Sequence, residues 1–281
     1  MDPEAFRVQA RTSWERAAAG WEARGELIRR CALPVSAALV ELARPHPGQR
    51  ILEVAAGLGD TGLLAAERVR PGGEVLITDG AEAMVEAARR RVAESGADDV
   101  EVRPMEAEWL DLPVASVDAI VSRWGYMLLA DPEAALREAR RVLRPGGRIA
   151  LAAWAPLEQN PWIGVLQGEL LARGLAPQPE PGAPGMFALA APGRVEGLLT
   201  DAGFEEIEVA DIDFAWEAES LDAWWEHQLA VSVSLGQALA GLSPAEHHRL
   251  RDALDAGYAR YVAPGGTVRL PARARLAAAS A

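Results

Sequence analysis

The chain has 281 residues and a formal net charge of −13, and half of its residues are apolar while a quarter are charged. This balance is typical of a folded globular protein, and the length accommodates one large α/β domain with an added lid. An acidic surface repels phosphate backbones and anionic lipids, so we expect neither nucleic acid nor a membrane surface as a partner.

Cys31 is the only cysteine, and a single thiol cannot form an internal disulfide. No cluster of Cys and His has the spacing of a metal site, so we expect no bound metal. Residues 1–6 lack the basic and apolar regions of a signal peptide, and no apolar run reaches the roughly 20 residues of a membrane span. We therefore expect a cytoplasmic protein without membrane insertion.

The first 47 residues predict an N-terminal helical cap, because apolar residues such as Trp14, Ala18 and Trp21 recur at helical spacing. From residue 48 onward, short β-like runs alternate with helical stretches, which is typical of a parallel, doubly wound α/β sheet. The predicted strands are Arg50–Ala55, Glu74–Thr78, Val100–Pro104, Ala119–Ser122 and Arg148–Ala153. The predicted helices between them are Gly62–Arg70, Ala83–Ser95 and Pro132–Leu143.

Past the fifth strand the alternation stops, and the sequence predicts helical lid insertions at residues 155–190 and 219–262. The core of residues 48–154 is expected to continue in 191–218 and to end with a final strand region in 263–281. The predicted elements here are the helices Trp162–Arg173, Gly193–Ala202, Leu221–Leu235 and Pro244–Tyr261, the strand Glu206–Phe214, and an extended proline-rich connector at 177–184. The sequence Ser243-Pro244-Ala245-Glu246 has the pattern of a helix capping box.

A glycine-rich turn of sequence GLGDTG, residues 57–62, follows the first predicted strand and precedes a helix. Asp79 ends the next predicted strand, 22 residues after Gly57. Glycines let the backbone approach a ligand, and an acidic side chain at the second strand accepts hydrogen bonds from ribose hydroxyls. The pattern therefore predicts a nucleotide-type cofactor, and both NAD and S-adenosyl-L-methionine fit it.

Two carboxylates near this turn favour the sulfur cofactor over the dinucleotide. A dinucleotide places its pyrophosphate at the helix N-terminus, where Asp60 would repel it. Glu53 lies inside the first predicted strand, where a buried carboxylate is costly without a partner. Both suit a ligand that carries an ammonium and a sulfonium group, although Asp60 is equally well explained as a helix N-cap.

Several motifs in order along the chain resemble those of class I S-adenosylmethionine-dependent methyltransferases, especially the small-molecule and quinone-biosynthesis branch. The matching segments are RILEVAAGLGDTG (50–62), ITDGAEAMVEAAR (77–89), MEAEWLDLP (105–113) and VDAIVSRWGYMLLADPEAALREARRVLRPGGRIALAAW (117–154). The resemblance is specific over residues 48–154 and weaker over 186–214. It implies a Rossmann-like, doubly wound, mostly parallel seven-stranded sheet with helical lid insertions, and S-adenosyl-L-methionine as cofactor.

The resemblance also implies which residues contact the cofactor. Glu53 would orient the methionine ammonium, Asp79 would take both ribose hydroxyls, and Glu106 would read the adenine edge. Ala55 stands where the family commonly has glycine, and Glu106 stands where aspartate is more usual. The remaining implied contacts are Ala55, Ala56, Gly57 and Gly59 in the turn, Gly80 and Met84 beside Asp79, Ala107 beside Glu106, and Ser122 and Arg123 near the methionine end.

Methyl transfer is an in-line displacement that demands alignment, and it needs a base only when the acceptor is a weakly acidic hydroxyl or nitrogen. The resemblance therefore implies no universal catalytic residue, and the candidate bases are His227 and Tyr126. Tryptophans gather in the lid segments, which indicates either an apolar or aromatic acceptor pocket or an ordinary lid core. They are Trp154, Trp162, Trp216, Trp224 and Trp225, with Trp124 after the fourth predicted strand.

The sequence thus predicts a methyltransferase that acts on a small, apolar or aromatic metabolite. The alternatives are an NAD(P)-dependent oxidoreductase and a catalytically silent cofactor-binding protein. Trp14 and Trp21 would either close over the cofactor or pack against the sheet. The methylated atom, carbon, oxygen or nitrogen, and the oligomeric state stay open.

Overall fold

The computed structural model describes residues 2–178 and 182–281, which form an α/β fold around one seven-stranded sheet. The strands are β1 (Arg50–Glu53), β2 (Glu74–Asp79), β3 (Val100–Pro104), β4 (Val117–Arg123), β5 (Leu143–Trp154), β6 (Glu205–Ala218) and β7 (Val268–Ser280). Their order is β3-β2-β1-β4-β5-β7-β6. Strands β1 to β5 pair in parallel, and β7 runs antiparallel to both β5 and β6. The predicted Rossmann-like, mostly parallel sheet is confirmed.

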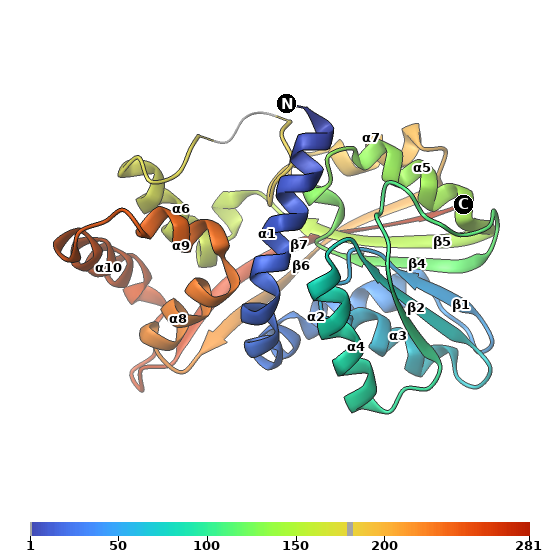
Figure 1. Cartoon of the computed structure of the whole chain (residues 1–281), viewed down its shortest axis with the longest axis horizontal. Helices are drawn as coiled ribbons and strands as arrows, with labels where there is room; N and C mark the ends of the chain where they lie inside the picture. The colour runs from blue at the N-terminus through green and yellow to red at the C-terminus, as the bar shows by residue number, and fades with distance from the viewer. Residues whose placement is uncertain (1, 179–181) are drawn as a thin grey trace.

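Within the described residues, α-helices precede, connect and follow these strands. They are α1 (Pro3–Ala23), α2 (Gly25–Ala43), α3 (Asp60–Val69), α4 (Glu82–Ser95), α5 (Pro132–Val142), α6 (Pro161–Ala172), α7 (Arg194–Asp201), α8 (Leu221–Val231), α9 (Val233–Leu239) and α10 (Pro244–Tyr258). Helices α2 and α3 pack together on one face of the sheet, and α5 and α7 pack together on the other (Figure 1). The strand interiors between these layers form the core, in which Leu52, Ile120 and Val121 are fully buried.

One predicted helix, Leu221–Leu235, is wrong as a single element. The structure breaks it into α8 and α9, because Ser232 adopts an extended backbone with φ −120° and ψ 100°. The Ser232 side chain then accepts a hydrogen bond from the backbone N–H of Leu235 and caps the second helix. The capping box predicted at Ser243 is confirmed, and the Glu246 carboxylate accepts a hydrogen bond from the Ser243 backbone N–H.

The sixth strand is longer than predicted and extends the sheet toward the lid. Pairing with β7 continues from Phe214 through Ala218, and Trp216 is buried within this extension. Helices α6, α8, α9 and α10 gather beyond this end of β6 and β7 (Figure 1). The middle of the predicted connector at 177–184, residues 179–181, lies outside the described residues.

Helix α1 lies between the sheet domain and the helices of the lid (Figure 1). It packs against α4 on one side and against α8 and α9 on the other. The indole N–H of Trp21 donates to the carbonyl of Val231 at 3.1 Å. Gly20 approaches Ala230 so closely that a Cβ at this position would lie 1.7 Å from the Ala230 carbonyl oxygen. A glycine is therefore needed where α1 meets the lid.

No helix in the described ranges, 2–178 and 182–281, is both long enough and apolar enough to cross a membrane.

Candidate functional site

The candidate site lies at the carboxyl ends of β1, β2 and β4, where the strand order reverses. Strand β1 pairs with β2 on one side and with β4 on the other, so the chain leaves the centre of the sheet in both directions. In open α/β sheets this reversal leaves a crevice above the strand ends, and ligands bind there. The glycine-rich turn that joins β1 to α3 enters this crevice.

The turn leaves space for a ligand against its backbone. Ala55, Gly57 and Gly59 all have positive φ, at 51°, 57° and 77°. A Cβ added at Gly57 would meet no atom within 4 Å, so the backbone faces open space at this point. The adjacent Ala56 N–H is bound by the carbonyl of Thr78 at 3.0 Å, which fixes the turn against β2. This shape suits close approach of a cofactor.

Glu53 is fully buried beneath this turn. Its Oε2 accepts a hydrogen bond from the Gly62 N–H at 2.7 Å, and a Cβ at Gly62 would lie 2.6 Å from the same oxygen. Burial raises the pKa of Glu53 to about 8, although the Gly62 N–H and the charge of Arg123 act in the opposite direction. A carboxyl group in this state gains a negative charge most easily when a cation arrives beside it.

Asp60 begins α3 and was predicted either to face a cationic ligand or to act as the N-cap. The N-cap prediction is wrong, because Gly59 occupies that position and Asp60 is the first helical residue. Its buried carboxylate instead pairs with Arg91, with Oδ1 2.8 Å from Nε, and with Arg123 at 3.3 Å. Two arginines therefore already compensate its charge. This pairing leaves Glu53 as the carboxyl group of the turn without an ion pair of its own.

Asp79, at the end of β2, is held in one orientation by two backbone groups. The Gly57 N–H donates to Oδ2 at 2.8 Å and the Ala81 N–H donates to Oδ1 at 3.0 Å. Burial raises the pKa of Asp79, and these two N–H groups partly offset the effect. Each carboxylate oxygen can still accept a second hydrogen bond, which is what a ribose diol requires.

The predicted adenine residues lie beside Asp79. A Cβ at Gly80 would be 2.7 Å from Oε2 of Glu106, so glycine allows this half-buried carboxyl group to approach the end of β2. Burial raises the pKa of Glu106, while Arg11, at 3.3 Å from its Oε1, lowers it. Ala107, next in the chain, is buried.

The remaining predicted residues are also close to the strand ends. Met84 is buried under α1, in a small apolar cluster with Ala17 and Ala18. Ser122 donates from its hydroxyl to the Val54 carbonyl at 2.8 Å, which joins the end of β4 to the turn. Arg123 donates to the Ser36 hydroxyl at 3.0 Å in addition to its pair with Asp60. The structure thus brings the predicted residues close to one set of strand ends.

The sequence interpretation missed the polar face of α1 that covers this crevice. Arg7 pairs with Glu108 at 2.7 Å, and Arg11 pairs with Glu106. Glu15 accepts hydrogen bonds from the backbone N–H groups of Glu82 and Ala83, at the beginning of α4. Residues 7, 11 and 15 are four apart and share one helix face, and this spacing was the available signal. Trp14 and Trp21 lie edge to face at 5.4 Å and contact the same apolar cluster.

A cluster of buried aromatic rings adjoins the other side of the turn. Trp124 follows β4 directly and stacks on Trp154 at a centroid distance of 4.3 Å. A Cβ at Gly125 would lie 2.6 Å from the Cβ of Ala55, so this segment packs directly against the turn. We call the rings the aromatic cluster, and its members are Trp124, Trp154, Trp162, Phe214, Trp216, Trp224 and His227.

The two candidate bases are both buried. His227 stacks on Trp224 at 5.2 Å, and burial lowers its pKa to about 4, helped by the charge of Arg24. Tyr126 is also buried, and burial raises the pKa of its hydroxyl well above the ordinary value. At neutral pH both groups are therefore uncharged. His46, His247 and His248 are exposed.

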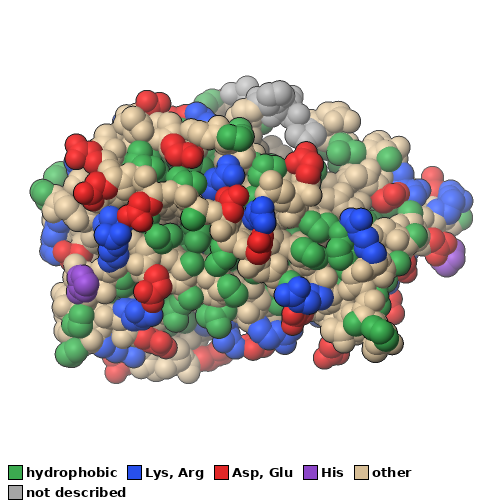
Figure 2. Space-filling view, turned by 180° about the vertical axis from the view of Figure 1, so that it is seen from behind, with side chains coloured by type: hydrophobic (Ala, Val, Ile, Leu, Met, Phe, Trp, Pro, Cys, Tyr) green, Lys and Arg blue, Asp and Glu red, His purple; other side chains and the backbone are tan. Residues whose placement is uncertain are grey.

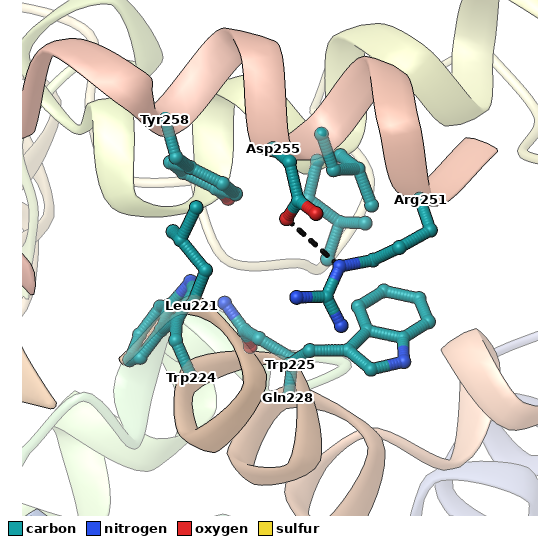
Figure 3. A pocket seen from close by; sticks show the side chains of 9 residues that line it. Leu221, Trp224, Trp225, Gln228, Arg251, Asp255 and Tyr258 are labelled. Carbon is teal, nitrogen blue, oxygen red and sulfur yellow. Dashed lines mark hydrogen bonds and ion pairs between the residues drawn. The ribbon is translucent and has the colours of Figure 1, made fainter. Parts of the chain in front are cut away.

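The described residues also form hollows away from these strand ends. A cavity of about 10 Å³ between α6, α8 and α10 is lined by Trp224, Trp225 and Tyr258; Arg251, also in its lining, donates to Asp255 one turn further along α10 at 2.8 Å (Figure 3). This volume is about that of one water molecule. A groove of about 490 Å³ runs along residues 72–76 and 98–101, at the amino ends of β2 and β3. It opens at the opposite edge of the sheet from the glycine-rich turn.

Comparison with known proteins identifies related chains. Residues 51–147 match the family described as a methyltransferase domain. The nocamycin O-methyltransferase of Saccharothrix syringae is 35% identical over 211 residues, which are 70% of this chain and 75% of that protein. The demethylmenaquinone methyltransferase of Thermus thermophilus is 41% identical over 119 residues, which are 42% of this chain and only 52% of that protein.

Solved structures share the fold. The YcgJ protein from Bacillus subtilis superposes with a TM-score of 0.57 at 20% sequence identity. The match covers 87% of this chain and 97% of that one. At this identity the likeness concerns the fold alone.

Proposed function

Because this chain belongs to the class I S-adenosylmethionine-dependent methyltransferases, in the branch that resembles quinone-biosynthesis enzymes, we propose that its acceptor is a small, apolar or aromatic metabolite. The cofactor is S-adenosyl-L-methionine, which supplies a methyl group on a positively charged sulfur. The observation that carries the site assignment is the grouping of Glu53, the open turn at Gly57 and Asp79 at one set of strand ends. An NAD(P)-dependent oxidoreductase is not favoured.

In this proposal each part of the crevice binds one part of the cofactor. Glu53 attracts the methionine ammonium, and Asp79 accepts hydrogen bonds from both ribose hydroxyls. Glu106 reads the adenine edge. The other contacts are the backbone of Ala55, Ala56, Gly57 and Gly59, the neighbours Gly80, Met84 and Ala107, and Ser122 and Arg123 at the methionine end.

The arrangement of charge supports a small-molecule acceptor rather than nucleic acid. On the face seen in Figure 2, arginine side chains lie beside acidic ones over much of the surface. Arg90 pairs with Glu22 at 2.7 Å, and Arg273 pairs with Asp213 at 2.6 Å. Paired arginines offer little to a phosphate backbone. The cytoplasmic location and the lid boundaries stay predictions from the sequence, and the oligomeric state stays open.

Calorimetric titration tests the proposed cofactor site. We expect the purified chain to bind S-adenosylmethionine and S-adenosylhomocysteine and not NADH. Changing Glu53 to Gln or Asp79 to Asn should weaken binding by about 1.5–3 kcal/mol each, because each removes a charge-assisted hydrogen bond. Glu67→Gln, on the exposed face of α3, is the matched control and should bind as the wild type does.

Two results would contradict this assignment. Binding of NADH without either sulfur ligand would exclude the methyl donor as the occupant of the crevice. Unchanged affinity in both the Glu53 and the Asp79 variants would place the cofactor elsewhere.

A further inference from the structure

The aromatic cluster and its border contain buried polar atoms that find no hydrogen-bond partner among the described residues. They are Nε1 of Trp124, Nε1 of Trp216, Nε1 of Trp224, Nδ1 of His227 and the hydroxyl of Tyr126. Their side chains are all more than nine-tenths buried, since the most exposed residue, Trp124, retains 8% of its surface. Burying such groups without partners costs stability, so a folded chain rarely retains several in one place.

Other tryptophans of the protein have hydrogen-bond partners for their indole N–H groups. Trp162 donates from its indole N–H to Oδ1 of Asn160 at 3.1 Å, and the buried Asn160 amide also holds backbone carbonyls. Outside the cluster, Trp21 donates to a lid carbonyl. Among the described residues, acceptors are therefore present for some indoles and absent for those of Trp124, Trp216 and Trp224.

The unpartnered groups belong to one continuous set of contacts beside the proposed cofactor site. The rings of Trp124 and Trp216 are 6.4 Å apart, and the rings of Trp216 and His227 are 5.8 Å apart. Trp124 and Tyr126 flank Gly125, which packs against Ala55 of the turn. Groups from the end of β4, from β6 and from α8 thus meet next to the methionine end of the crevice.

The chemistry of these atoms specifies a complementary ligand. An indole N–H only donates, so Trp124 and Trp216 require hydrogen-bond-accepting atoms on the ligand. Neutral His227 offers an accepting Nδ1 when its other nitrogen carries the proton, so it suits a hydroxyl donor. Flat rings around these atoms favour a flat, apolar body.

We propose that the aromatic cluster is the methyl-acceptor site, and that the acceptor is a planar aromatic molecule with both a hydroxyl group and a carbonyl oxygen. The carbonyl oxygen accepts from the indole N–H of Trp216 or Trp124, and the hydroxyl donates to His227. This inference rests on the proposed function, because it places the acceptor next to the proposed methionine end. It goes beyond that function in naming the recognition groups on both sides.

The stability of single variants separates a binding role from a packing role. Trp216→Phe loses buried ring volume but no hydrogen bond to a described residue, so its melting temperature should fall less than that of Trp162→Phe. Trp162→Phe deletes a donor that holds Asn160, so its melting temperature should fall. If both indoles only packed, both substitutions would lower the melting temperature by about the same amount.

Binding of defined probes tests the ligand chemistry. We suggest 7-hydroxycoumarin and 7-hydroxyflavone as flat probes with a hydroxyl and a carbonyl oxygen, and coumarin and flavone as their counterparts without the hydroxyl. Binding is measured by calorimetry at pH 6.5 on the full chain saturated with S-adenosylhomocysteine. We expect at least one hydroxylated probe to bind at least tenfold more tightly than its counterpart.

The variants complete the test. Trp216→Phe should lower the affinity for the hydroxylated probe about tenfold. His227→Leu should make the hydroxylated probe bind no more tightly than the counterpart without the hydroxyl. Trp225→Phe is the matched control, because this residue is on α8 but lies against Arg251 outside the cluster. Equal binding of the paired probes, or unchanged binding in Trp216→Phe, would overturn the inference while S-adenosylhomocysteine still binds. Failure of S-adenosylhomocysteine to bind would instead contradict the proposed function.

Discussion

Cofactor binding should release a proton from Glu53. Burial raises the pKa of this carboxyl group to about 8, so at pH 7 roughly nine-tenths of the unliganded protein carries a proton there. The ammonium of the cofactor favours the carboxylate and should bring the pKa back down. Binding near neutral pH must therefore be coupled to deprotonation of Glu53.

The size of the effect follows from the pKa. If the bound state is fully ionised, affinity is proportional to the ionised fraction of free Glu53. That fraction is about 1% at pH 6 and about 24% at pH 7.5 for a pKa of about 8, so affinity should rise about 25-fold over this interval. This change in affinity corresponds to about 1.9 kcal/mol of binding free energy.

Calorimetry in two buffers of different ionisation enthalpy measures the protons released. We expect about 0.9 proton per S-adenosylhomocysteine bound at pH 7, and close to none in Glu53→Gln. Asp79 also has a raised pKa, so the Gln variant separates its contribution from that of Glu53. Proton release near zero in the wild type, with affinity constant between pH 6 and 7.5, would refute this reasoning.

Three further predictions concern stability. The folded state holds the Glu53 proton between pH 4.5 and about 8, so stability should fall across this window, by on the order of 5 kcal/mol, and Glu53→Gln should remove the decline in melting scans. Ala55→Gly should raise the free energy of unfolding by up to about 1 kcal/mol, because Ala55 has φ 51°; lower stability would contradict this. Glu15→Ala should cost about 1 kcal/mol and speed hydrogen exchange at the first amides of α4, because Glu82 and Ala83 lose their acceptor; unchanged exchange would contradict this.

The parallel core could be predicted because its signals are local. Short strand-forming runs separated by helical stretches indicate each strand, and β3 has the bounds expected, Val100–Pro104. The central residues of the crevice, Glu53, Gly57 and Asp79, could be placed because parallel strands end at the same edge of a sheet. Their order along the chain therefore gives their position in space.

Contacts between distant segments could not be predicted in this way. Asp60 pairs with Arg91 and Arg123, and nothing near residue 60 indicates which arginines will reach it. The raised pKa of Glu53 depends on complete burial, which is a result of tertiary packing. The unpartnered indole of Trp216 appears only after every neighbour has been placed, because each tryptophan has the same hydrogen-bonding potential in a sequence.

The position of α1 has a kinetic consequence. One end of this helix holds the proposed adenine rim through Arg11 and Glu106, and the other end holds the lid through Trp21 and Val231. Displacing α1 breaks both sets of contacts in one event. Exchange of the spent cofactor and release of the methylated product would then require the same displacement of α1.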